Sequence, residues 1–329
     1  MAVNNGFPSR GLIIMSQKII IDTDPGIDDT MAIFFALNSP EIDLLGLTTV
    51  YGNTSTEKGT INALRILEIA SRTDISVYAG AIKPLESEYK GKGEFVHGHD
   101  GQGNTNLELP KTKAGTGSAL DFLEKTIKEN PGEVTLVPVG PLTNIAQLLL
   151  NNPKIAKDIK EIILMGGNAL SQGNASPSAE ANIRNDPEAA DIVFSADCQI
   201  SMVGLDVTNQ VFMDKEHIDK IVNFDSPQTK HLKKIFPFYV DFLSKFFDKE
   251  GMATHDSSAI AYLIDRSLFK TIQYPIVVET LGISRGKTWM GTGMDQLDYN
   301  PWENRRNVNI CIEVDEEKVI DLIIERVAS

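Results

Sequence analysis

The chain contains few cysteines and no long apolar run. Its 329 residues include two cysteines, Cys198 and Cys311, which do not form a close pair, so a zinc ribbon and a CxxC redox motif are excluded. One disulfide is arithmetically possible, but we expect two buried free thiols in a reducing cytosol and therefore a cytoplasmic protein. Because no apolar stretch approaches the ~20 residues of a membrane span, we expect no transmembrane helix.

Positive charge is also scarce. Lys and Arg total 31 against 45 Asp and Glu, which gives a formal net charge of −14 and a pI near 4.8. An acidic surface repels nucleic-acid backbones and anionic membranes, so we expect neither nucleic acid nor a membrane as a partner. Small neutral substrates or cations fit this charge better.

Apolar, strand-like runs alternate with amphipathic, helical stretches. The runs are apolar at nearly every position, which is typical of strands buried on both faces of a parallel sheet. Strand-then-helix alternation predicts right-handed crossovers, so we predict an α/β fold with an open, mostly parallel, Rossmann-like sheet flanked by helices. The expected strands are 18–22, 42–50, 75–80, 133–140, 161–167, 199–207, 275–282 and 307–315, and the clearest helices are 28–39, 56–72 and 141–152.

Two stretches lack a regular pattern, residues 81–116 and 168–186. Long loops inside a compact α/β domain are usually functional or disordered. No linker or repeat divides the chain, so we predict one domain over residues 17–329 with functional loop insertions. Residues 1–16 precede the fold pattern, and we expect a disordered N-terminal extension there.

Residues 214–248 form a helical and charged segment. It contains His217 and His231, and the charged neighbours of these two histidines lead us to expect both at the surface.

Four carboxylates follow the first expected strand: Asp22, Asp24, Asp28 and Asp29. In open α/β sheets ligands bind at the carboxyl ends of the strands, and a helix cap needs one Asp rather than four. Carboxylates forced together raise one another's pKa unless a cation is present. Oxygen ligands with no nearby Cys or His point to a hard ion, Ca²⁺ or Mg²⁺.

The spacing is not that of an EF-hand, so further ligands must come from elsewhere in the chain. Asp256 follows His255 at the start of an expected helix and is one candidate, although a helix cap at Asp256 with a solvent-facing His255 explains the pair equally well. The segment "VPVGPLTNIA" turns sharply after a strand. Carbonyls there are free to face an ion, but a plain strand-to-helix turn is the alternative.

Several separated motifs recur in order along the chain from Lys18 to the terminal helix: "DTDPGIDD", "TTVYGN", "HGHDG", "VPVGPLTNIA", "LMGG", "AEANI", "DPEAA", "MVGLDVT" and "HD". Together they resemble the inosine–uridine-preferring nucleoside hydrolase family. The resemblance implies hydrolysis of the N-glycosidic bond of ribonucleosides to ribose and a free purine or pyrimidine base. It also implies one bound Ca²⁺ and assembly as a homodimer or homotetramer.

The resemblance implies roles for individual residues around the ion. The carboxylate ligands would be Asp24, Asp29 and Asp256, joined by the main-chain carbonyl of Val139. Asp24 would also be the general base that accepts a proton from a water bound to the ion.

The ribose would be held by a second implied set of residues. Asp28 and Asn53 would bind ribose hydroxyls near the ion, and Met165 would lie beneath the sugar. The 5′-hydroxyl side would contact Asn174, Glu180 and Asn182.

The leaving base must gain a proton or a hydrogen bond. His255 is the implied acid, because the ordinary pKa of histidine lies in the useful range. His97 would be a second polar group near the base or the ribose rim, although His97 and His99 could also be a polar surface loop. Tyr239 lies on the expected helix before the "HD" motif, where the family often carries two tyrosines, but Leu243 stands one helical turn later.

Two other functions fit parts of the sequence. A haloacid dehalogenase-type phosphatase also uses two Asp two positions apart, like Asp22 and Asp24, but this reading leaves Asp28, Asp29 and the "HD" motif without a role. A non-catalytic ribose- or nucleoside-binding relative is the other alternative, and the full carboxylate set argues against it.

Overall fold

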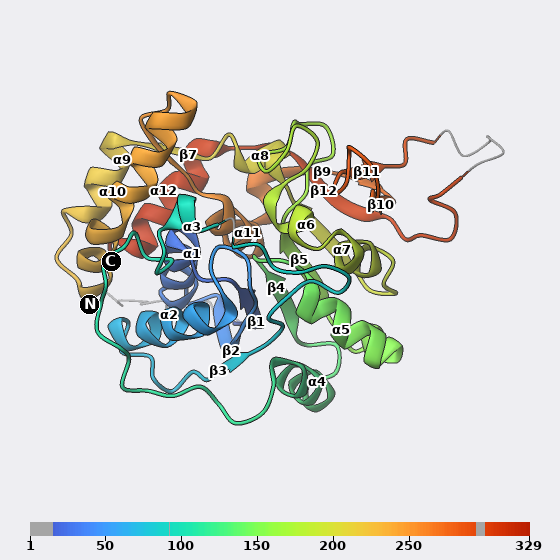
Figure 1. The fold of residues 1–329 in the computed structure, drawn as a ribbon, viewed down its shortest axis with the longest axis horizontal. Coiled ribbons are helices and arrows are strands. Elements are labelled where there is room, and N and C mark those ends of the chain that lie inside the picture. The colour runs from blue at the N-terminus through green and yellow to red at the C-terminus, as the bar shows by residue number, and fades with distance from the viewer. Residues whose placement is uncertain (1–15, 92, 294–299) are drawn as a thin grey trace, which may run out of the picture.

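The computed structural model describes residues 16–91, 93–293 and 300–329. Its main feature is a central sheet covered by helices on both faces (Figure 1). The N-terminal extension is expected over residues 1–16; residues 1–15 lie outside the described residues, and only Ser16 is described.

Eight strands form the central sheet in the order β3-β2-β1-β4-β5-β6-β12-β9. Every neighbouring pair is parallel except β12 and β9, which are antiparallel. The first six positions follow the doubly wound order, so the winding direction reverses between β1 and β4, where such folds bind ligands. The strands are β1 (Gln17–Thr23), β2 (Ile42–Thr49), β3 (Val77–Ala79), β4 (Thr135–Pro138), β5 (Glu161–Met165), β6 (Ile200–Val203), β9 (Phe269–Tyr274) and β12 (Val308–Val314).

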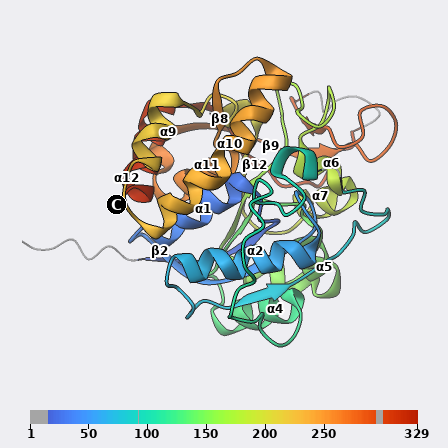
Figure 2. The same ribbon diagram turned by 60° about the vertical axis from the view of Figure 1, so that its left-hand side comes forward.

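Successive residues of β1 point into different cores, as strand geometry requires. Ile19 and Ile21 pack into one core and Ile20 into the other. The first core lies under α1 (Ile27–Leu37), α2 (Thr56–Ile69), α9 (Lys215–Val222), α10 (Pro227–Phe247), α11 (His255–Ile264) and α12 (Glu316–Val327). The second lies under α4 (Ala119–Glu129), α5 (Thr143–Asn151) and α7 (Pro187–Phe194). Figure 2 shows α10, α11 and α12 gathered around α1, away from α4.

The remaining elements are short. Two small antiparallel pairs lie outside the central sheet: β7 (Phe212–Asp214) with β8 (Gly251–Ala253), and β10 (Ile276–Val278) with β11 (Thr288–Met290). Three short helices, α3 (Glu94–His97), α6 (Ala181–Asn185) and α8 (Leu205–Thr208), lie in connecting segments, as do the 3₁₀ turns Pro153–Lys157 and Arg266–Leu268. None of the described helices has both the length and the apolar character that crossing a membrane requires.

The predicted α/β fold is confirmed, but the strand expected over 275–282 is only β10, which lies outside the central sheet, and other elements differ at their ends. The strand expected over 199–207 ends at Val203, because Gly204 is the N-cap residue of α8. The two patternless stretches contain only α3 and α6 among their described residues. The antiparallel edge strand β9 had no clear sequence signal, since its burial pattern has one buried position among six.

The expectation that His231 lies at the surface is wrong. His231 is 4% exposed, and its Nε2 donates to Oε1 of Gln102 over 2.8 Å. Gln102 in turn donates to the carbonyl of Gly26 and to the hydroxyl of Thr30, each over 3.0 Å. The buried face of α10 therefore fastens to the start of α1, and a helix with many surface lysines hides one histidine on its inner face.

We expect Phe34→Ala to destabilise the protein by about 3–5 kcal/mol, because Phe34 is fully buried in the core under α1 and its removal leaves a cavity. The shift in the denaturant midpoint at constant slope measures this loss. Leu150→Ala is the control, since Leu150 is exposed at the end of α5 and should change stability by no more than about 0.5 kcal/mol. Equal midpoints for both variants would contradict this view of the core.

Candidate active site

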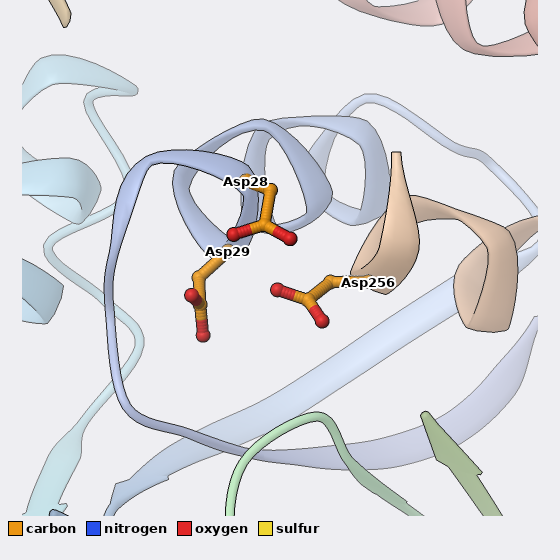
Figure 3. Close-up of side chains that lie close together, drawn as sticks. All are labelled: Asp28, Asp29 and Asp256. Atoms are coloured by element: carbon orange, nitrogen blue, oxygen red, sulfur yellow. The ribbon is translucent and has the colours of Figure 1, made fainter. Parts of the chain in front are cut away.

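Two helix N-termini meet at the carboxyl edge of the sheet, beside the reversal between β1 and β4. Asp28 and Asp29 lie in the first turn of α1, and Asp256 lies in the first turn of α11. Figure 3 shows the three carboxylates gathered in the space between the two helix ends. All three residues are buried, and one oxygen from each lies within 4.8 Å of the others, close enough to hold one metal ion.

The carboxylate of Asp29 is fixed by three hydrogen bonds. Its Oδ1 accepts from the Thr23 hydroxyl over 2.6 Å. Its Oδ2 accepts from the Gly26 amide and from Nδ2 of Asn53, each over 2.9 Å. The bond from Gly26 is the capping interaction at the start of α1, so local helix chemistry and the site use the same side chain.

Asn53 joins Asp24 to the same group. The Asn53 amide donates to Oδ2 of Asp24 over 2.6 Å, while its side chain binds Asp29. Oδ1 of Asp24 is buried and has no hydrogen-bonding partner among the described residues. A buried carboxylate oxygen without a donor is costly, and this one is free to bind a cation.

Two glycines let the backbone close around Asp24. A Cβ on Gly52 would lie 1.9 Å from Oδ2 of Asp24, and a Cβ on Gly140 would lie 2.7 Å from its Oδ1. Gly140 follows Val139 at the end of β4, so the carbonyl-bearing turn after β4 lies against Asp24. Gly52 stands in the motif "TTVYGN" and Gly140 at the sharp turn of "VPVGPLTNIA", but the contact of each with Asp24 depends on the fold and cannot be read from the sequence.

Burial makes the ionised forms of these carboxylates unfavourable. It raises the pKa of Asp28 to about 8, and the charge of Asp29 adds to the effect. Burial also raises the pKa values of Asp24 and Asp256 well above the usual range, with further contributions from their acidic neighbours. Such a cluster is stable when ionised only if a cation balances it, which is the condition that the sequence predicted.

Asp22, the first of the four clustered carboxylates, faces other partners. Its Oδ1 accepts from the Thr48 hydroxyl over 2.6 Å and from Nδ2 of Asn144 over 2.7 Å. Burial raises the pKa of Asp22 to about 7, against the effect of these hydrogen bonds. Asp22 thus ties β1 to β2 and α5 rather than joining the three-carboxylate group.

His97 lies beside Asp28 at the start of α1. It is 6% exposed, and its Nδ1 accepts from the Ile27 amide over 3.1 Å, so the ring proton lies on Nε2. Burial lowers the pKa of His97 to about 4, which makes the ring neutral at neutral pH. Its ring stacks on Tyr239 of α10 with a centroid distance of 5.7 Å. His99, by contrast, is exposed and contacts Glu94.

His255 is the first residue of α11 and precedes Asp256. Its Nδ1 lies 2.8 Å from the hydroxyl of Thr208. Burial lowers the pKa of His255 to about 4, and the neighbouring His97 and Lys249 lower it further. The ring is therefore neutral at neutral pH. In this form it can donate a hydrogen bond, whereas proton delivery requires the protonated form.

A second set of residues lies at the ends of β4 and β5. Asn182 donates through Nδ2 to the carbonyls of Val139 and Met165, over 2.9 and 3.2 Å. Glu180 caps α6 and accepts from the amides of Asn182 and Ile183. These residues are buried together, and Val139 connects them to the turn that touches Asp24.

Asn174 is the exposed member of the predicted sugar-binding group. Its Oδ1 accepts from the Ala181 amide at the start of α6 over 3.0 Å. Asn174 therefore lies in the loop before α6 and contacts the start of the helix that Glu180 caps and that contains Asn182.

The comparisons with known proteins agree with this arrangement. The sequence profile of the inosine-uridine preferring nucleoside hydrolases matches residues 19–321. The chain belongs to this family. It is therefore an N-glycosyl hydrolase that acts on nucleosides, and the haloacid dehalogenase alternative is wrong because the profile covers nearly the whole chain.

Individual nucleoside hydrolases resemble the chain over almost its full length. The probable uridine nucleosidase 2 of Arabidopsis thaliana is 42% identical over 94% of this chain and 97% of the relative. The pyrimidine-specific ribonucleoside hydrolase RihA of Photobacterium profundum is 39% identical over 96% of this chain and 100% of the relative. Among solved structures, a plant nucleoside hydrolase superposes with a TM-score of 0.93 at 40% identity, covering 95% of this chain and 99% of the other.

A purine-preferring relative is also similar. The ribonucleoside hydrolase from Gardnerella vaginalis superposes with a TM-score of 0.88 at 32% identity and covers 95% of this chain and 98% of its own. The shared fold therefore accommodates enzymes of different base preference.

We expect Gly52→Ala to lower nucleoside hydrolysis about a hundredfold, because the added Cβ displaces Asp24 and a misplacement of about 1 Å has this effect on catalysis. Turnover, measured alongside the unfolding midpoint, tests this. Gly132→Ala is the control: it lies before β4 in a left-handed conformation with open space around it, so it should cost about 1–2 kcal/mol of stability without lowering turnover. Equal losses of turnover in both variants would remove the steric argument.

Proposed function

We propose that the enzyme hydrolyses pyrimidine ribonucleosides, with uridine as the principal substrate, to ribose and the free base. The observation that carries the chemistry is the convergence of Asp28, Asp29 and Asp256 at the two helix starts, to which Asn53 joins Asp24. The pyrimidine preference rests on the relatives named uridine nucleosidase and pyrimidine-specific ribonucleoside hydrolase.

The donor set fits a calcium ion. The side chains that face one another are carboxylates, and Ca²⁺ prefers 6–8 oxygen ligands in flexible geometry. The partnerless Oδ1 of Asp24 is the clearest sign, because this buried oxygen lacks a donor among the described residues. Asp24, Asp29, Asp256 and the carbonyl of Val139 would hold the ion. When bound, it would lower the pKa of a coordinated water and bind the ribose diol.

The ribose hydroxyls would be oriented by Asp28 and Asn53 on the cluster side. One carboxylate oxygen of Asp28 lies within 4.8 Å of oxygens of Asp29 and Asp256. Asn53 donates hydrogen bonds to both Asp24 and Asp29. Met165 would lie beneath the sugar, and Asn174, Glu180 and Asn182 would receive its 5′-hydroxyl side. A site built to bind the 2′-hydroxyl rejects a deoxyribonucleoside, because the buried polar groups would be left unpaired.

Bond cleavage follows from the negative charge of the site. As the C1′–N bond breaks, its electron pair moves to the base, and C1′ and the ring oxygen develop oxocarbenium-like positive charge. The surrounding carboxylates stabilise this charge. Water attacks C1′, and Asp24 accepts the proton that the water loses.

The leaving base would receive a hydrogen bond or a proton from His255. His97 and Tyr239 form a stacked pair next to Asp28, and this pair would offer the base an apolar ring face and a ring N–H. The low pKa of His255 keeps the ring neutral at neutral pH, so the neutral ring would stabilise the leaving base by a hydrogen bond and only its protonated fraction would transfer a proton.

We also propose that residues 17–329 are the catalytic domain, that the enzyme is cytoplasmic, and that it forms a homodimer or homotetramer. The two buried free cysteines, Cys198 and Cys311, suit a reducing compartment. The turn between β10 and β11 exposes Leu281 and Ile283, apolar side chains of the kind that subunit interfaces cover.

We expect uridine to release uracil and reducing sugar in the presence of Ca²⁺, and deoxyuridine to react at least about a hundredfold more slowly. Chelation should stop turnover, and added Ca²⁺ should restore it. Asp24→Ala should abolish turnover, whereas Asp43→Asn at an exposed position serves as the control. Nucleoside binding without release of base would favour the non-catalytic alternative.

Calorimetric titration of Ca²⁺ tests the metal site independently, and wild-type affinity in Asp256→Asn would contradict it.

We expect His255→Ala to lower kcat for uridine by about 10²- to 10⁴-fold, the usual contribution of a general acid. A riboside with an activated leaving group, such as 4-nitrophenyl riboside, needs no protonation and should lose much less. His99→Ala, in the exposed loop, should leave both rates unchanged. Equal losses on the two substrates in His255→Ala would remove this residue as the acid.

A further inference from the structure

The loop between β5 and α6, residues 166–180, carries two of the proposed sugar-binding residues. Asn174 lies within it, and Glu180 ends it. The loop has no helix or strand of its own among its residues. Because backbone without regular hydrogen bonding opens at low cost, something else must fix its shape.

A carboxylate holds the amide side of this loop. Oδ2 of Asp206, in α8, accepts from the Ala169 amide over 2.7 Å. Its Oδ1 accepts from the next two amides, Leu170 over 2.8 Å and Ser171 over 2.7 Å. Three consecutive N–H groups therefore converge on one side chain, and hydrogen bonds to an ionised acceptor are the strong ones.

An ammonium group holds the carbonyl side of the same residues. Lys287, just before β11, is only 7% exposed. Its Nζ donates to the carbonyl of Asn168 over 2.7 Å, and more weakly to those of Ala169 and Ser171 over 3.3 and 3.4 Å. A lysine has three donors, so these carbonyls use its full capacity.

Asp206 thus binds the amides of residues 169–171, and Lys287 binds carbonyls of the same turn, residues 168–171. Burial lowers the pKa of Lys287, and the nearby carboxylate of Asp206 opposes this shift. Each charge satisfies main-chain polar groups that would otherwise be left without partners.

The turn of residues 168–171 is directly connected to the proposed sugar-binding group. The Gly167 amide donates to Oε2 of Glu180 over 3.0 Å, and Gly167 precedes Asn168. The Thr288 hydroxyl both donates to the Asn168 carbonyl and accepts from its amide. The loop begins at residue 166, directly after Met165 at the end of β5. A shift of the turn therefore moves one of the three amides that hold the Glu180 carboxylate.

We propose that Asp206 and Lys287 are positioning residues for the 5′-hydroxyl subsite, which hold the 166–180 loop in the shape that presents Asn174 and Glu180 to the sugar. This inference rests on the proposed sugar-binding role of those two residues. Neither Asp206 nor Lys287 touches the substrate. Their effect is to order the loop before the nucleoside binds, so that binding does not have to order it.

The test compares uridine with 5′-deoxyuridine in the variants Asp206→Asn and Lys287→Met. We expect kcat/KM for uridine to fall about tenfold or more, the usual effect of losing charged hydrogen bonds. For 5′-deoxyuridine, which lacks the hydroxyl, the fall should stay within about twofold. The double variant should lose less than the product of the single losses, because both residues hold one loop. Lys270→Met and Asp241→Asn, at exposed positions, are the matched controls.

Equal losses on both substrates, or no loss on uridine, would overturn the inference. Hydrogen exchange measures the loop without any activity: the amides of residues 169–171 should exchange faster in folded Asp206→Asn than in the wild type, and unchanged exchange would also overturn it. The proposed function fails separately, if the wild type releases no uracil from uridine. If the wild type hydrolyses both substrates at the same rate, the 5′-hydroxyl subsite and the inference fail together.

Discussion

The structure depends on confining negative charge where two helices begin. The first turns of α1 and α11 bring Asp28, Asp29 and Asp256 together in a buried space, and Asp24 joins them through Asn53. Helix N-termini offset part of this repulsion through their free amides and dipoles. The remainder calls for a cation. The same excess of negative charge then suits a reaction in which a sugar carbon becomes positive, so one electrostatic condition serves both the ion and the chemistry.

The fold explains why this confinement is possible. The winding of the sheet reverses between β1 and β4, so the helices that follow these strands diverge and leave a space at their carboxyl ends. Glycines at 52 and 140 let two turns approach Asp24 closely. On the other side of that space, the ends of β4 and β5 carry hydrogen-bonded polar groups suited to a sugar. The carboxylate cluster and the proposed sugar-binding group meet at Val139, whose carbonyl accepts from Asn182.

Much of this arrangement was predictable from the sequence, and the limits have physical causes. The buried parallel strands are apolar at nearly every position, so β1, β2 and β4 were clear, and the carboxylates at the end of β1 stood out by number. The edge strand β9 gave no such signal, since only one of its six residues is buried. The burial of His231 depended on which face of α10 meets α1, which charge along the helix does not reveal. The Asp206 and Lys287 contacts are made to main-chain atoms, and such contacts leave no pattern in the side chains of the loop.

The carboxylates that share one space are encoded early and late in the chain. During synthesis, the acidic start of α1 emerges long before α11, and until Asp256 arrives these groups remain in water with ordinary affinities for ions. An ion that needs both helix starts could therefore bind only after α11 has been made, and it would join two segments that lie far apart in the sequence. A nascent or truncated chain that stops before α11 keeps an acidic surface that the finished protein hides.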